Sequence, residues 1–155
     1  MKLQWKKLLV MVAIPLAVGG LSALLSGSAR GFAQLDAPPL TPPGWVFPVV
    51  WTILYILMGL GSYKVLVSGG LREDVTSALA VYFIQLAVNF LWPLVFFRWE
   101  LRLTAFWILI GLWALVLTTM VRFYRLDQRA GDCLLPYLLW VTFAGYLNFG
   151  FFLEN

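Results

Sequence analysis

Five long apolar runs divide this chain, and they restrict it to one class of fold. The runs cover about residues 8–26, 46–67, 78–97, 103–121 and 134–153. Each is long enough to cross the hydrocarbon core of a bilayer, which takes roughly 20 residues in a helix. A spanning segment must pair its backbone polar groups internally, so helices are the expected form. We therefore predict an all-α integral membrane protein, a bundle of five transmembrane helices that forms a single domain over residues 1–155.

The composition agrees with this class. The chain is 62% hydrophobic and only 12% charged, whereas soluble domains are about 25% charged. The central portions of the runs contain no charged residue, and Lys64 lies near an end, where its side chain can reach water. The first run also fits a secretory signal peptide, because lysines precede it and Ser26-Gly27-Ser28-Ala29 resembles a cleavage site. Its length favours a span, and its removal would leave four.

Basic residues lie unequally on the two sides of the predicted bundle. The side of the amino terminus carries eight of them, namely Lys2, Lys6, Lys7, Lys64, Arg72, Arg122, Arg125 and Arg129. The opposite side carries three, namely Arg30, Arg98 and Arg102. The positive-inside rule then places the amino terminus in the cytoplasm, and we expect a bacterial cell membrane. These residues are spread over the breaks between spans, so we expect no nucleic-acid partner.

The segment 30–44 would face outward, and it is the longest connection and the richest in proline. Proline fixes φ and removes a backbone donor. The segment is therefore interpreted as a stiff lid or as a rigid connector, and the sequence does not separate the two.

The residue types that are absent exclude several chemistries. The chain has one cysteine, Cys133, and no histidine. An internal disulfide, a CxxC redox pair and a Ser-His-Asp triad are therefore excluded, and a catalytic metal is disfavoured. We expect no catalytic residue, no metal site and no cofactor.

Uncharged polar and aromatic residues lie on one face of the third span. Gln85 and Asn89 are four residues apart, and Trp92 and Phe96 continue the same helical face. A carboxamide in hydrocarbon needs a partner, so this face must point inward. Interhelical bonding is the favoured interpretation for Gln85. For Asn89, bonding between helices and a place in the lining of a cavity remain equal alternatives.

The fifth and second spans carry similar stripes. In the fifth span, Tyr137, Trp140 (or Val141), Ala144 and Asn148 recur at helical spacing. In the second span, Trp51 and Tyr55 lie a turn or more inside the membrane, so the interfacial aromatic belt does not explain them. We predict a pocket for a flat apolar ligand, with Trp51, Tyr55 and Trp140 as its strongest candidates.

Three motifs in spans two, three and five are recognisable together. The patterns PPxWxFxxxWxxLYxLM, QLxxNxxWxxxFF and PYxxWxxFAxxLN resemble those of the translocator protein family, also called the tryptophan-rich sensory protein or peripheral-type benzodiazepine receptor family. The resemblance implies five transmembrane helices, often paired as a homodimer, and a pocket that opens toward the loop between spans one and two. It also implies porphyrin ligands, including haem and protoporphyrin IX, and for some members sterols or synthetic aromatic drugs.

Carried over by motif, the resemblance implies a specific set of ligand-binding residues. The pocket would be lined by Trp45, Trp51, Tyr55, Asn89, Trp92, Trp140, Phe143, Ala144 and Asn148.

The first loop departs from the family pattern WYxxLxKPxWxPP. Two tryptophans and one lysine of that pattern are replaced, with Ala37 at the position of the lysine and Leu40 at that of one tryptophan. Ala37 cannot pair with a porphyrin carboxylate. The resemblance associates the tryptophan at the position of Leu40 with light-dependent porphyrin breakdown.

Three functions follow as hypotheses. The first is a receptor or carrier, with a sensory or tetrapyrrole-regulating role, that binds porphyrins, and sterols or lipids as alternatives, in an aromatic pocket within the bilayer. The second is an enzyme that degrades porphyrin in light, which Leu40 disfavours. The third is a membrane scaffold that acts through protein partners. We expect the first, because the sequence offers no constellation for ordinary catalysis.

Overall fold

The computed structural model describes residues 2–155, and this part of the chain is helical and contains no strand. Five helices are long and apolar enough to span a membrane, as the sequence predicts. In order they are α1 (Trp5–Ser26), α3 (Val46–Leu66), α4 (Arg72–Pro93) with the π-helical turn η1 (Leu94–Arg98), α5 (Arg102–Leu126) and α6 (Gln128–Glu154). A short helix, α2 (Ser28–Ala33), lies in the first loop and was not predicted.

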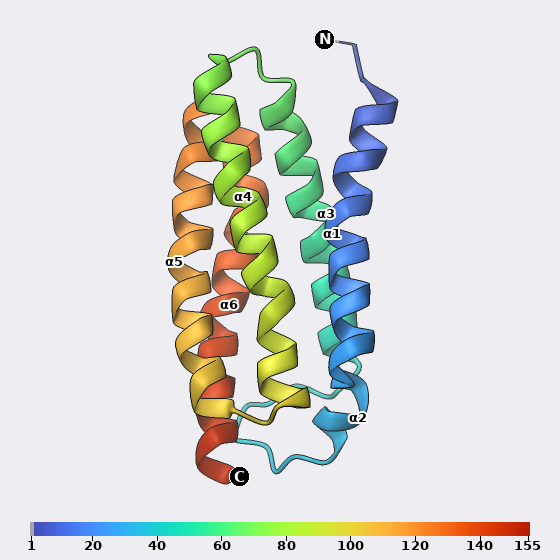
Figure 1. The fold of residues 1–155 in the computed structure, drawn as a ribbon, viewed down its shortest axis with the longest axis vertical. Helices are drawn as coiled ribbons and strands as arrows, with labels where there is room; N and C mark the ends of the chain where they lie inside the picture. The colour runs from blue at the N-terminus through green and yellow to red at the C-terminus, as the bar shows by residue number, and fades with distance from the viewer. Residues whose placement is uncertain (1) are drawn as a thin grey trace.

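The five long helices form a closed ring. Going round it, α1 packs on α3, α3 on α6, α6 on α5, α5 on α4, and α4 on α1. An odd number of spans places the two ends of the chain at opposite ends of the bundle (Figure 1). The core contains the fully buried side chains of Met58, Tyr82, Phe123 and Tyr137.

Several helices extend beyond the apolar runs from which they were predicted. The helix α4 begins six residues early, at Arg72, and has Glu73 and Asp74 in its first turn, where acidic side chains favour the helix dipole. Asp127 separates α5 from α6, and its carboxylate accepts hydrogen bonds from the amides of Arg129 and Ala130 at 2.8 and 3.2 Å. Hydropathy predicts only the part of a helix that lies in the hydrocarbon. The ends of the helix are set by capping residues and charged side chains, which lie outside that part.

A glycine in α3 allows α1 to pack closely against α3. A Cβ atom at Gly59 of α3 would lie 2.6 Å from the Cα of Val12, so the two helix backbones are close there. Ser22 donates a hydrogen bond of 2.8 Å to the carbonyl of Phe90 in α4. The first apolar run is therefore an integral part of the helix packing.

Residues 34–45, here called the strap, connect α2 to α3 across the end of the bundle that holds the C-terminus (Figure 1). Pro38 is buried against Gly150 of α6, where no side chain would fit. The amide of Asp36 donates to the side chain of Asn155 at 3.3 Å, and the Asn155 side chain donates to the carbonyl of Asp36 at 2.9 Å. The strap is thus attached to the last turns of α6.

Candidate functional site

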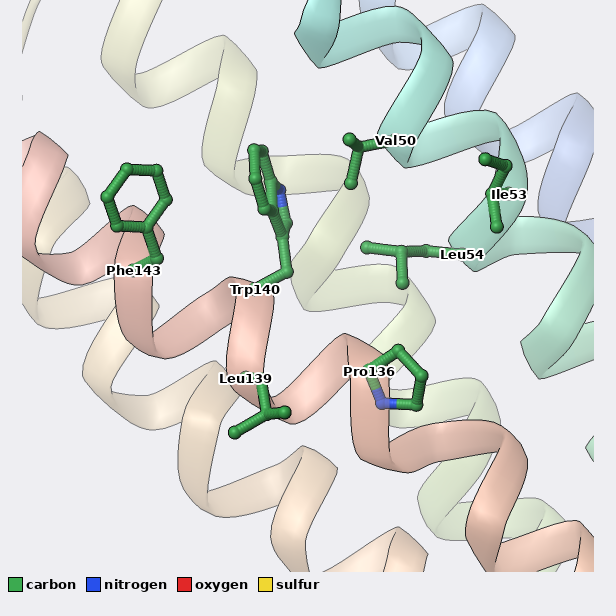
Figure 2. A pocket seen from close by; sticks show the side chains of 7 residues that line it. All are labelled: Val50, Ile53, Leu54, Pro136, Leu139, Trp140 and Phe143. Atoms are coloured by element: carbon green, nitrogen blue, oxygen red, sulfur yellow. The ribbon is translucent and has the colours of Figure 1, made fainter. Parts of the chain in front are cut away.

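A groove with two aromatic side chains in its walls lies between α3 and α6. Its walls carry seven side chains, namely Val50, Ile53, Leu54, Pro136, Leu139, Trp140 and Phe143 (Figure 2). The groove has a volume of about 400 Å³, within the range of about 300–1,000 Å³ typical of ligand pockets. It faces outward, since Ile53 is 52% and Leu139 is 63% exposed. The groove is therefore open to the lipid.

Trp140 forms the central wall of this groove. Its ring lies 5.8 Å from that of Phe47 and 5.6 Å from that of Phe143, centroid to centroid. Figure 2 shows it standing between Phe143 and Val50. Among residues 2–155, its buried Nε1–H has no hydrogen-bond partner. A buried donor without a partner is costly, and a ligand in the groove would reach this one only if the Trp140 side chain turned to expose it.

Two further predicted residues, Tyr55 and Asn89, belong to a hydrogen-bonded chain inside the bundle. The Tyr55 hydroxyl donates to Asn89 Oδ1 at 2.8 Å, and Asn89 Nδ2 donates to the Tyr137 hydroxyl at 2.6 Å. The Tyr137 hydroxyl in turn donates to Gln85 Oε1 at 2.7 Å. This polar chain joins α3, α4 and α6, so the amide of Asn89 already serves contacts between helices. The interhelical interpretation of Gln85 agrees with this geometry.

Trp51 covers the polar chain on the side of α3. Its ring stacks on Tyr55 with centroids 5.6 Å apart and meets the edge of Tyr137 at 6.1 Å. It is half-buried and is not among the side chains that line the groove. Its contacts are therefore those of a second layer behind the groove.

A third group of predicted residues forms hydrogen bonds between α4 and α6, nearer the strap. Trp92 Nε1 donates to Asn148 Oδ1 at 2.9 Å, and Asn148 Nδ2 donates to the carbonyl of Arg102 at 2.8 Å. Ala144, one turn before Asn148, is buried. The side chain of Asn148 thus bonds two neighbouring helices, and a role in orienting a ligand stays a prediction.

The remaining predicted residue, Trp45, lies outside these groups. It is 69% exposed at the start of α3. Leu40 in the strap is 81% exposed as well, and Ala37 is also exposed. The loop residues singled out from the family pattern therefore make no wall of the groove.

Sequence reasoning missed the aliphatic half of the groove. Val50, Ile53, Leu54 and Leu139 are ordinary for a lipid-facing surface, and their types carry no signal that separates a groove from the rest of the helix. Only the pairing of α3 with α6 in space brings them opposite Trp140.

A second groove lies between α5 and α6 and has a volume of about 460 Å³. Its lining includes Phe106, Trp113, Gly145 and Phe149. Trp113 Nε1 donates to Thr142 Oγ1 at 2.8 Å, so its indole N–H is satisfied. This difference from Trp140 makes the groove between α3 and α6 the better candidate for a ligand with polar atoms.

The fold and site define an integral membrane protein of five helices with an aromatic groove at their surface. The sequence pattern of the TspO/MBR family matches residues 11–153. The chain belongs to this family, which confirms the resemblance seen in the sequence motifs.

Curated relatives support the same assignment. A tryptophan-rich sensory protein of Cereibacter sphaeroides is 39% identical over 149 residues, which cover 96% of this chain and 91% of the relative. A tryptophan-rich protein TspO of Chlorobaculum tepidum is 40% identical over 118 residues, 76% of this chain and 75% of the relative. The translocator protein of Homo sapiens is 36% identical over 127 residues, 81% of this chain and 75% of the relative.

The polar chain yields a stability prediction with an internal control. Tyr137→Phe leaves Asn89 Nδ2 and Gln85 Oε1 without their partner, so we expect a loss of about 1–2 kcal/mol of unfolding free energy. Tyr82→Phe is the control, because the Tyr82 hydroxyl is buried without a partner among the described residues, and its removal should be neutral or stabilising. Denaturant unfolding in detergent micelles measures both. Equal stability of the two variants would contradict the role given to the polar chain.

Proposed function

We propose that the protein binds porphyrins and related flat hydrophobic molecules within the membrane, as a receptor or carrier with a sensory or tetrapyrrole-regulating role. The observation that carries the proposal is the groove between α3 and α6, with Trp140 as its wall (Figure 2). A flat macrocycle would gain apolar burial and an edge contact with this ring. The family membership and the relatives named for sensing and translocation support the wider function.

The chemistry of the groove also suggests how a ligand would be oriented. Its walls are apolar, and the indole N–H of Trp140 is buried behind them without a partner among the described residues. A ligand with a carbonyl or carboxylate oxygen at its edge would accept this hydrogen bond while its face covers Val50 and Leu54. The outward opening would let a lipid-soluble ligand reach the groove from the bilayer.

Trp140→Ala tests the site. Truncation of a buried aromatic anchor costs about 2 kcal/mol or more, so the dissociation constant for protoporphyrin IX should rise about thirtyfold or more. Trp51→Ala should weaken binding less, since Trp51 lies behind the groove. Binding should be followed by the absorbance of the porphyrin. Tryptophan fluorescence would change in these variants simply because each lacks one tryptophan.

Trp5→Ala is the matched control for this titration. Trp5 is 64% exposed at the opposite end of the bundle, so its loss should leave the affinity unchanged. Thermal unfolding of each variant in micelles checks that the bundle persists. Wild-type affinity in Trp140→Ala would contradict the assignment of the groove.

The orientation in the membrane completes the proposal. The excess of basic residues at the end that holds the amino terminus supports a cytoplasmic amino terminus. In a Cys133→Ser background, a membrane-impermeant maleimide applied to intact cells should label Ala37→Cys in the strap and leave Gln128→Cys unlabelled. Both positions are exposed and lie at opposite ends of the bundle. The reverse labelling pattern would overturn the orientation.

A further inference from the structure

The second groove lies between α5 and α6, which pack along their lengths (Figure 1). Two hydroxyl groups line it, and both donate hydrogen bonds within the protein. Thr142 Oγ1 accepts from Trp113 Nε1 and donates to the carbonyl of Leu138 at 2.9 Å. The Tyr146 hydroxyl donates to the carbonyl of Pro39 at 2.7 Å. Since neither hydroxyl proton is left for a ligand, this groove suits a hydrocarbon chain.

A positively charged residue, Arg102, lies at the end of this groove nearest the strap. Phe106 and Trp113, which line the groove, follow it by four and eleven residues, so the three lie on one face of α5. The guanidinium carbon of Arg102 lies 5.6 Å from the centre of the Phe96 ring. Its Nε is buried without a hydrogen-bond partner among residues 2–155, while the residue as a whole is partly exposed. An apolar groove therefore ends at a charge that an anion can approach.

The depth of the groove matches one leaflet of a bilayer. Trp99, three residues before Arg102, is 54% exposed, which is typical of a tryptophan at the level of the lipid headgroups. The eleven residues from Arg102 to Trp113 rise by about 16 Å along α5. Half of the hydrocarbon core is about 15 Å thick. The groove therefore extends from the headgroups to about the centre of the bilayer.

We propose that this groove binds one phospholipid of the leaflet on the side of the strap, with an acyl chain between α5 and α6 and the phosphate on Arg102. A guanidinium group forms strong charge-assisted hydrogen bonds with phosphate oxygens, and basic sites between transmembrane helices are suited to lipid headgroups. The site uses a different groove from the proposed porphyrin site, so it does not depend on porphyrin binding.

The attraction is that of one guanidinium group for one phosphate. The charged side chains at this end of the bundle cancel in number, namely Arg30, Arg98 and Arg102 against Asp36, Glu100 and Glu154. A general attraction of a basic surface for anionic lipid therefore does not apply here. Removal of Arg102 should affect binding more than removal of another arginine at the same end.

The chain offers matched variants for both parts of the lipid. A Cβ atom at Gly145, which lines the groove, or at Gly111, which does not, would meet no atom within 4 Å. Gly145→Leu therefore fills the groove without a clash, and Gly111→Leu adds the same side chain elsewhere. For the phosphate, Arg102→Gln is compared with Arg98→Gln. Arg98 is exposed at the same end and donates to the carbonyl of Leu25 at 3.2 Å.

Native mass spectrometry of the full chain, titrated with dioleoyl phosphatidylglycerol in detergent micelles, tests the proposal. Wild-type protein should bind one lipid more tightly than any further lipid. Arg102→Gln and Gly145→Leu should each raise the dissociation constant of that lipid about tenfold, and the two control variants should stay within about twofold of wild type. Thermal unfolding in the same micelles checks that each variant is folded.

A comparison of lipids on wild-type protein needs no variant. Dioleoylglycerol has the same chains and no phosphate, so it should bind about tenfold more weakly than dioleoyl phosphatidylglycerol. Equal affinity for the two lipids overturns the role of Arg102, as does equal affinity of Arg102→Gln and Arg98→Gln. Wild-type affinity in folded Gly145→Leu overturns the placement of the chain. A protein that binds this lipid and no porphyrin would contradict the proposed function and support this site.

Discussion

The bundle depends on one constraint, the need of every polar group in hydrocarbon to find a partner inside the protein. The hydrogen bonds from Tyr55 through Asn89 and Tyr137 to Gln85 Oε1 meet most of this need at the centre of the bundle, and Gln85 Nε2 has no partner among the described residues. The four side chains of this polar chain come from α3, α4 and α6, so it fixes the rotation of three helices about their axes. Trp51 packs against Tyr55 and Tyr137 at its outer edge.

This arrangement separates two roles that the sequence motifs combine. Asn89 and Asn148 bond neighbouring helices, and Trp92 donates to Asn148. Trp140 instead stands in the wall of a groove with its indole N–H unpaired in the described part of the chain. The interior residues thus hold the helices in register, and the groove presents the surface that a flat ligand would cover.

The strap adds a third component, at the end of the bundle. It is anchored on α6 through hydrogen bonds at Pro39 and Asp36. Phe32 of α2, just before the strap, packs on Phe47 of α3. Its proline content accords with both a lid and a connector, because stiffness serves either. The hydrogen bonds between the strap and α6 hold the segment across the end of the bundle, and they are compatible with either role.

Much of this architecture could be predicted from the sequence. The features that were not predicted have physical reasons for leaving no local signal. The five spans follow from long apolar runs, and the inward faces of α4 and α6 follow from the helical spacing of Gln85 with Asn89 and of Tyr137 with Asn148. The early start of α4 at Arg72 was missed because charged ends of helices leave no hydropathy signal.

Other features depend on contacts between residues far apart in the chain. The aliphatic wall of the groove resembles any lipid-facing surface until α3 is placed against α6. The bonds between Asp36 and Asn155 join residues 119 apart, and no local pattern encodes them. Trp45 is exposed at the start of α3, and its place among the ligand-binding residues stays a prediction.

The most direct test of the central claim is a crystal structure of the protein with protoporphyrin IX bound, grown from lipid. The account predicts a macrocycle between α3 and α6, with its face on Val50 and Leu54, its edge against Trp140, and an acceptor atom within hydrogen-bonding distance of Trp140 Nε1. A macrocycle in the groove between α5 and α6, or one inserted among Tyr55, Asn89 and Tyr137 with their mutual hydrogen bonds broken, would contradict it.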